Sequence, residues 1–298
     1  SLRKMDKNLD RNYLKNIKKF SKSYRTSKDG ASLVVPGTVE DLEWNHMDHA
    51  HRPHIHNTYE KELRLYYTKN SATSLTFWKH LPIILHVNDF YIDKGLFSQT
   101  INLLGIIFIE TKLSLTYLSK HETKMRVDWF VTSHWIFKPL HKILLKMLSK
   151  LHIKLQDEDF VIRNQRASLR KIGYEFLDNQ PNYISSNNMN LNVIYPKMNK
   201  PFKKSLIELP LDEDHSVYAE KNLFIFNKKS DHELLIWPGV CPHQGGSLEN
   251  CPISGNAKVC PWHGLNIPAI ELKNNETNVN KYGFNFKLKQ DYVEITNE

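Results

Sequence analysis

Residues 241–264 read CPHQGGSLENCPISGNAKVCPWHG and contain all three cysteines of the 298-residue chain. Cys241 is followed after one residue by His243, and Cys260 after two residues by His263. Glycines follow both pairs, where the backbone has to turn tightly around the ligand side chains. Proteins framed by disulfides distribute their cysteines differently, so this grouping favours metal or redox chemistry in the cytoplasm.

Two thiolates and two imidazoles suit a [2Fe–2S] cluster in which the cysteines bind one iron and the histidines the other. Neutral imidazoles raise the reduction potential above that of an all-cysteine cluster. Tetrahedral zinc also accepts two Cys and two His, but zinc fingers place their histidines together after the cysteines. Because each loop here carries one Cys and one His, the iron–sulfur interpretation is favoured. Cys251 has no ligand role in this pattern and is expected to be a small buried or free thiol.

The stretch resembles the Rieske iron–sulfur domain, and the resemblance extends from about Leu206 to the last residue. It implies that Cys241, His243, Cys260 and His263 are the cluster ligands. No cysteine follows His243 closely, so the disulfide that shields the cluster of cytochrome-complex Rieske proteins is missing. The chain is therefore more similar to the oxygenase and ferredoxin branch.

Residues 43–56, EWNHMDHAHRPHIH, hold five of the fifteen histidines. Such a segment can be solvated surface or an adventitious metal site. Its spacing resembles the iron motif of Rieske non-haem iron oxygenases, in which an Asp precedes the first ligand histidine by three residues and a second histidine follows by five. The resemblance implies that His51 and His56 bind a mononuclear Fe(II) and that Asp48 links His51 to a histidine of the cluster.

A second frame is open, in which Glu43 and His46 take the places of Asp48 and His51, and His51 that of His56. It keeps the spacings but puts Asp48 where the family has a proline. Residues 156–165, QDEDFVIRNQ, resemble the closing helix of that family, with an early Asp and a later Gln, which implies that the third ligand lies there and that Asp157 is the first choice. Glu158 and Asp159 stay open because the family spacing to the Gln varies. All three can also be ordinary acids of a first helical turn, which the helix dipole favours.

Short strands rich in β-branched and aromatic residues are predicted at 63–67, 75–78, 83–87, 101–109, 113–117 and 125–129. Met125, Val127, Trp129 and Val131 alternate with polar residues, as in an antiparallel sheet with one buried face. Two helical stretches follow, one around residues 144–151 and one over about 156–172. The predicted fold class is α+β: a helix-grip (START-like) antiparallel sheet with a long closing helix, then a small all-β Rieske domain.

The predicted domains are a basic lead-in (1–30), a START-like catalytic domain with the mononuclear iron (31–178), an Asn- and Pro-rich linker (179–205) and the Rieske domain (206–298). In the oxygenases that the chain resembles, the Rieske domain comes first, and electrons cross between neighbouring subunits. The resemblance therefore implies a ring, most simply a homotrimer, in which His263 of one subunit faces Asp48 of the next.

The formal net charge is +9, from 41 Lys and Arg against 32 Asp and Glu. No nucleic-acid module accompanies the basic residues, so no nucleic-acid partner is expected, and an acidic protein partner or solubility explains the charge. The longest apolar run, 103–109, is too short to span a membrane, and the first residues lack the apolar core of a signal peptide. The expected location is the cytoplasm.

The favoured function is an oxygenase that uses O2 and electrons to hydroxylate a small organic, apolar substrate; mono- and dioxygenation both stay open. No G-x-G-x-x-G motif occurs among the eleven glycines, so electrons are expected from a separate ferredoxin or NAD(P)H-dependent reductase. The alternative is a Rieske electron-transfer or sensing protein fused to a START-like lipid-binding module without catalytic iron.

Overall fold

The computed structural model describes residues 23–79, 83–177, 191–273 and 279–298. The chain divides into two compact units. The first holds the described residues up to 35 together with 58–118 and 122–158, and the second holds 36–57, 119–121 and the rest of the chain from 159. Within the described residues, no helix is long and apolar enough to cross a membrane.

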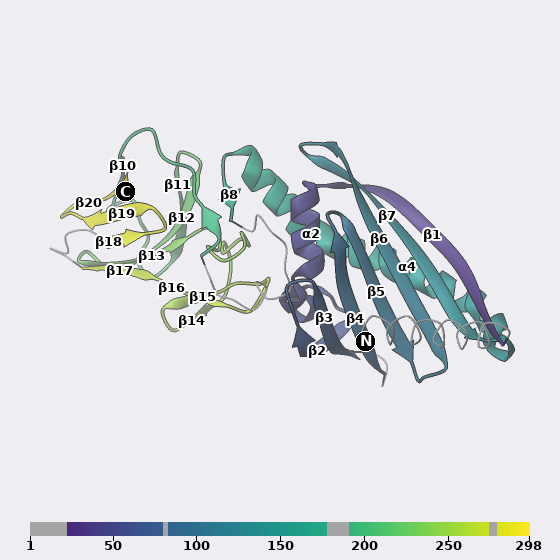
Figure 1. Ribbon diagram of the computed structural model, residues 1–298. Helices are drawn as coiled ribbons and strands as arrows, with labels where there is room; N and C mark the ends of the chain where they lie inside the picture. The colour runs from purple at the N-terminus through teal and green to yellow at the C-terminus, as the bar shows by residue number, and fades with distance from the viewer. Residues whose placement is uncertain (1–22, 80–82, 178–190, 274–278) are drawn as a thin grey trace, which may run out of the picture. The chain divides into compact units, whose positions relative to one another are not determined.

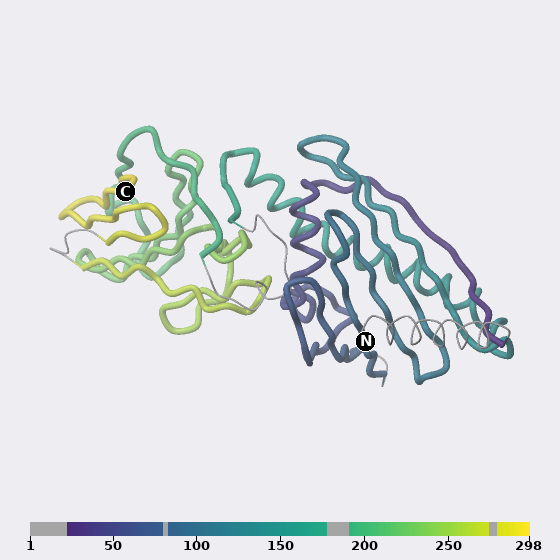
Figure 2. Tube along the Cα trace, viewed as in Figure 1, coloured from purple at the N-terminus to yellow at the C-terminus, as the bar shows by residue number. Residues whose placement is uncertain are grey.

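The first unit is built on an antiparallel sheet whose seven described strands run in the order β1-β7-β6-β5-β4-β3-β2 (Figure 1). Strands β2 to β7 follow one another as neighbours, whereas β1 pairs with β7 at the far edge. The chain therefore crosses from one edge of the sheet to the other between β1 and β2, as the tube in Figure 2 traces. The strands are β1 (Tyr24–Pro36), β2 (Tyr59–Tyr67), β3 (Ser71–Trp78), β4 (Ile84–Asp93), β5 (Leu96–Leu103), β6 (Ile107–Ser119) and β7 (Glu122–His134).

A single long helix follows the sheet. After a 3-10 helix, η2 (Trp135–Leu140), α4 (His141–Lys171) runs for 31 residues. The His152 ring of α4 packs edge-on against Trp129 of β7, with ring centroids 5.5 Å apart, and Lys154 Nζ donates to Thr58 Oγ1 at 3.1 Å. The helix thus covers the face of the sheet that carries Trp129. This is the helix-grip (START-like) arrangement, so the predicted α+β class is confirmed.

Alternation along the strands decides which side chains are buried. On β7, Met125, Val127, Trp129 and Val131 are all buried, as the sequence pattern predicts. Phe97 of β5 is also fully buried, whereas Phe108 of β6 exposes 45% of its surface. One face of the sheet is therefore core and the other meets solvent.

Three predicted boundaries differ from the structure. Residues 101–109 were expected as one strand, but Leu104 and Gly105 have φ of 55° and 69° and turn the chain between β5 and β6. The continuous apolar run predicted an unbroken strand, whereas Gly105 is the residue in the sequence that indicates a turn. The two expected helices form the single helix α4. Strand β1 begins at Tyr24, inside the expected lead-in, because an edge strand pairs through its backbone and needs no apolar pattern.

The second unit contains short helices and an all-β part. Two four-stranded sheets, β10-β20-β19-β18 and β11-β12-β13-β17, enclose a core that includes Phe224, Phe226, Phe284 and Phe286. The small all-β domain is thus present as predicted. The helices are α2 (Val39–Met47), η1 (His49–His51) and α3 (Arg52–Ile55). The strands are β8 (Glu175–Phe176), β9 (Val193–Ile194), β10 (Phe202–Ser205), β11 (Asp214–Ala219), β12 (Asn222–Ser230), β13 (Glu233–Pro238), β14 (Ile253–Ser254), β15 (Ala257–Val259), β16 (Asn266–Pro268), β17 (Ile270–Lys273), β18 (Val279–Lys281), β19 (Phe284–Leu288) and β20 (Tyr292–Asn297).

The expected linker, 179–205, is only partly a linker. Residues 178–190 lie outside the described residues, but β9 pairs with β8 and β10 pairs with β20. The all-β part therefore starts before residue 206. The histidine segment and Asp159 also belong to the second unit rather than to the unit of the large sheet. Long-range packing sets these boundaries, and composition alone does not report it.

Truncating Phe97 tests the assignment of the buried face. We expect Phe97→Ala to lower the free energy of unfolding by about 3–5 kcal/mol, because it leaves a cavity in a fully packed site. Phe108→Ala, on the exposed face, is the matched control and should cost less than about 1 kcal/mol. Urea denaturation measures both, and equal losses would contradict the assignment.

Candidate metal centres

The two Cys/His loops have the same backbone geometry. In the first, Cys241 N–H donates to Gly246 O at 2.7 Å and Gly245 N–H donates to Cys241 O at 3.0 Å. In the second, Cys260 N–H donates to Leu265 O and Gly264 N–H to Cys260 O, both at 2.8 Å. Each loop is thus closed on itself immediately after its ligand residues. Two equivalent loops present two Cys and two His to a common centre.

The loop side chains meet in a buried place. The His243 and His263 rings are edge-on with centroids 4.8 Å apart, and Cys241 and Cys260 belong to one apolar cluster. A Cβ added at Gly246 would lie 3.0 Å from Cys260 Sγ, so any larger residue there would press on the ligand. The loops therefore leave a cradle that a side chain at position 246 would crowd.

Neighbouring charges and hydrogen bonds set the protonation of these side chains. The Cys241 thiol donates to Cys260, which lowers the pKa of Cys260 to about 5, and the thiolate is the form that binds iron. Burial by itself would lower the pKa of His263, but the neighbouring Asp48 carboxylate raises that pKa to about 10. Among the described residues, no hydrogen-bond partner meets the buried His263 Nδ1. The nearby Cys260 also contributes to the raised pKa of His263. The four residues fit a [2Fe–2S] cluster.

The histidine segment is shaped by a short helix and a bend. Helix α2 starts after Thr38, whose side chain accepts a hydrogen bond from Asp41 N–H at 3.1 Å. It ends at Asp48, whose φ and ψ of −80° and 77° break the helical path. The 3-10 helix η1 then carries His51, and Pro53 opens the single turn of α3, after which His56 stands in extended backbone. Because the chain bends at Asp48, the residues after it leave the path of α2.

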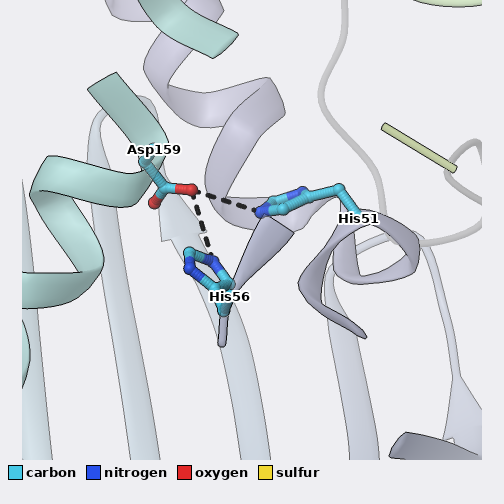
Figure 3. A group of neighbouring side chains, drawn as sticks. All are labelled: His51, His56 and Asp159. Carbon is cyan, nitrogen blue, oxygen red and sulfur yellow. Dashed lines mark ion pairs between the residues drawn. The ribbon is translucent and has the colours of Figure 1, made fainter. Parts of the chain in front are cut away.

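His51, His56 and Asp159 form a group in which the possible ligand atoms lie within 4.8 Å of one another. Asp159 Oδ1 is 3.4 Å from His51 Nε2 and 3.3 Å from His56 Nε2, and Figure 3 shows the three side chains converging. All three residues are buried. Burial would raise the pKa of Asp159, but the hydrogen bond from His51 and nearby positive charges hold it at about 2. Two imidazoles and a carboxylate in this arrangement fit a divalent iron site with open positions.

Asp159 belongs to this group, and Asp157, the first choice made from the sequence, does not. Two residues apart on a helix means about 200° of rotation, so Asp157 points to solvent while Asp159 is buried. Asp159 shares its helical stripe with the buried residues Ile162 and Leu169, and that phase was the available sequence signal. His46, from the second frame, is not a member of the one such group found among the described residues.

Asp48 stands between the two centres. Its Oδ2 is 2.6 Å from His263 Nε2 and 3.8 Å from His51 Nδ1. The opposite nitrogen of His51, Nε2, faces Asp159. Burial would raise the pKa of Asp48, yet the charge and hydrogen bond of His263, and then those of His51, keep it well below its usual range. A single carboxylate oxygen thus lies between His263 of the Cys/His loops and His51 of the second group, within one chain.

A buried ion pair that the sequence analysis did not identify braces the loops. Arg166 Nε donates to Asp41 Oδ1 at 2.9 Å, and Arg166 Nη1 donates to Gln244 Oε1 at 2.9 Å. The guanidinium lies 3.9 Å from the ring centroids of Trp44 and Phe176. Gln244 directly follows His243, so this pair fixes a cluster loop to α2 and α4. Isolated charges on two helices gave no signal of it in the sequence.

Comparison with known proteins supports part of this assignment. Residues 204–273 match the Rieske [2Fe-2S] domain family, whose domain binds a [2Fe–2S] cluster. No curated protein sequence matches the chain significantly.

Several solved structures are similar at low identity. A norcoclaurine synthase mutant from Thalictrum flavum is 11% identical, with 48% of this chain and 98% of that chain covered and a TM-score of 0.41. The Zhui aromatase/cyclase from Streptomyces sp. R1128 is 8% identical, with 48% and 96% covered and a TM-score of 0.41. A START superfamily protein from Mycobacterium smegmatis is 12% identical, with 44% and 94% covered and a TM-score of 0.36.

Loss of either loop histidine tests the cluster assignment. We expect His243→Ala and His263→Ala each to abolish the visible and EPR spectrum of an imidazole-ligated [2Fe–2S] cluster, because each removes one ligand of the second iron. His49→Ala, which changes a buried histidine outside both groups, is the control and should keep the spectrum. An unchanged spectrum in either loop variant would contradict the ligand set.

Proposed function

We propose that the chain is a Rieske-type non-haem iron oxygenase. Electrons from a separate ferredoxin or NAD(P)H-dependent reductase would reach O2 and a small organic substrate. The reaction for a monooxygenase is R–H + O2 + 2e⁻ + 2H⁺ → R–OH + H2O, and a dioxygenase would place both oxygen atoms in the product. Iron supplies the O2 chemistry in such an enzyme, and the cluster supplies single electrons.

The observation that carries the proposal is the position of Asp48. Its carboxylate is 2.6 Å from His263 Nε2, and the same oxygen is 3.8 Å from His51 Nδ1. A pure electron carrier has no need for a buried carboxylate that joins its cluster histidine to a second group of two histidines and an acid. An oxygenase needs that connection, since electrons must pass from one centre to the other.

Each residue has a specific task in this proposal. His51, His56 and Asp159 would hold the iron and leave neighbouring positions for O2 and substrate. His263 Nε2–H would donate a hydrogen bond to the Asp48 carboxylate. This bond fixes the ring so that Nδ1 points away from Asp48. Asn45 Nδ2 donates to Asp159 Oδ1 at 3.4 Å and helps to orient that carboxylate.

The path would lie within one chain. The family resemblance suggested a ring of subunits in which a neighbour supplies the cluster, most simply a trimer. Here Asp48 and His263 of the same chain are hydrogen-bonded, and both belong to the second compact unit. Placing the cluster domain after the closing helix therefore removes the need for a neighbouring subunit in this link.

Iron content separates the oxygenase from a carrier or sensor fused to a ligand-binding module. We expect three irons per chain in the wild type, and two in His51→Ala, His56→Ala and Asp159→Ala, with the [2Fe–2S] spectrum unchanged. Asp157→Ala, two residues from Asp159 but exposed, is the matched control and should keep three. Two irons in the wild type, together with no substrate-coupled O2 uptake, would favour the carrier.

Replacing the bridging carboxylate tests the electron path. Asp48→Asn should preserve three irons and the cluster spectrum, but slow substrate-dependent oxidation of the reduced cluster by about 100-fold, because the neutral amide loses the charge-assisted hydrogen bond to His263 and the attraction of the carboxylate for His51. Stopped-flow spectroscopy follows this oxidation.

Mixed variants then decide whether the path lies within one chain. A mixture of His51→Ala and His263→Ala proteins should stay inactive, since neither chain holds both centres. Restored turnover in the mixture would contradict the single-chain path and support a ring in which subunits exchange electrons.

A further inference from the structure

Residues 135–154, WIFKPLHKILLKMLSKLHIK, form η2 and the first half of α4 and contain five lysines and no acidic residue. The lysines recur at every fourth position, and Lys142, Lys146 and Lys150 are exposed on the helix. Like charges at this spacing lie on one face and destabilise an isolated helix. An anionic partner on this exposed face would offset the repulsion.

Large apolar side chains stand between these lysines. Trp135, Ile136, Ile143 and Met147 each expose more than half of their surface. Together with Lys138, Lys142, Lys146 and Lys150 they make what we call the basic stripe. Large exposed apolar patches with polar groups around them are typical of protein or membrane interaction sites.

Residues of the basic stripe line a pocket. It has a volume of about 930 Å³ and lies within the first unit. Trp135, Ile136 and Leu145 give it apolar walls, and four lysines of the stripe line it as well. Asp29 is the one acid among its lining residues within the part of the chain that the structure describes. Within the same described residues, Lys142, Lys146 and Lys150 form no ion pair with a carboxylate. A cationic hollow with apolar walls suits an anionic group attached to an apolar body.

We propose that the basic stripe docks the protein on an anionic membrane surface. Lysines beside exposed Trp, Ile and Met are the composition of helices that lie in the plane of a lipid interface: the apolar side chains enter the headgroup boundary, and the ammonium groups meet lipid phosphates. Lysine stems can reach sideways and keep their charge at the headgroups. The surface would hold an oxygenase beside membrane-dissolved apolar substrates, but the docking stands on the stripe alone.

Two other occupants fit the stripe less well. An acidic protein would meet the lysines but leave Trp135, Ile136 and their apolar neighbours to find matching pockets. Residues 1–22 of the chain itself carry eight Lys or Arg and two Asp, so they add to the positive charge and would be repelled. The anionic bilayer satisfies charge and apolar surface together.

Vesicle binding by the full-length protein tests the proposal. Wild-type protein should float with phosphatidylcholine vesicles containing about one third phosphatidylglycerol, bind vesicles of phosphatidylcholine alone far more weakly, and dissociate as salt screens the lysines. Lys142→Glu/Lys146→Glu/Lys150→Glu should weaken the partition coefficient by about 100-fold or more, given roughly fivefold per lysine. Trp135→Ala/Ile136→Ala should weaken it by about tenfold or more without changing net charge.

The control variant is Lys197→Glu/Lys200→Glu/Lys221→Glu, which makes the same charge change at exposed lysines of the second unit. It should keep binding within a few-fold of the wild type, and an unchanged [2Fe–2S] spectrum and circular dichroism show that each variant is folded. Equal losses in the two triple variants, or a wild type that does not bind anionic vesicles at low salt, would overturn the proposal. Loss of electron transfer from the reductase without vesicle binding would assign the stripe to an acidic protein instead.

Discussion

A buried carboxylate, Asp48, connects the two candidate metal centres in the second unit of this protein. Asp48 is 1% exposed, and a charged carboxylate in such a place is costly unless positive or hydrogen-bonding groups meet it. His263 meets it at 2.6 Å from the cluster loop, and His51 approaches it from η1. Because one oxygen serves both histidines, the two loop systems cannot separate without leaving that charge uncompensated. This contact links the geometry of the two candidate metal centres.

The Arg166 ion pair holds the same elements from the other side. Asp41 on α2 and Gln244 in the cluster loop both bind the guanidinium, while Trp44 and Phe176 cover its faces. Arg170 also donates to both oxygens of Asp41, so Asp41 keeps a cation if Arg166 is removed, whereas removing Asp41 takes the buried carboxylate away from Arg166. The second change is costly because a buried charge loses its compensation. The network thus fixes the loop of Gln244 to α2, which ends just before Asp48. Arg166 lies on α4, the helix that also carries Asp159.

In the proposed oxygenase the cluster domain follows the domain with the large sheet, and this order gives the proposed electron route a path within one chain. The segment from α2 to α3 is inserted between β1 and β2 of the large sheet, yet it belongs to the second unit together with the end of α4. The compact unit that carries the candidate centres is therefore assembled from distant segments. The basic stripe belongs to the first unit, so docking and redox chemistry use separate parts of the chain.

The sequence by itself determined the chemistry-bearing residues whose spacing is local. Cys241 with His243 and Cys260 with His263 could be paired because loop ligands lie one or two residues apart, and alternation identified the buried face of β7. Tertiary structure placed Asp159 beside His51 and His56 and joined Asp48 to His263 across 215 positions of the chain. The apolar stripe of a helix separates Asp159 from Asp157 in the sequence, but only long-range packing shows which side chains that stripe meets.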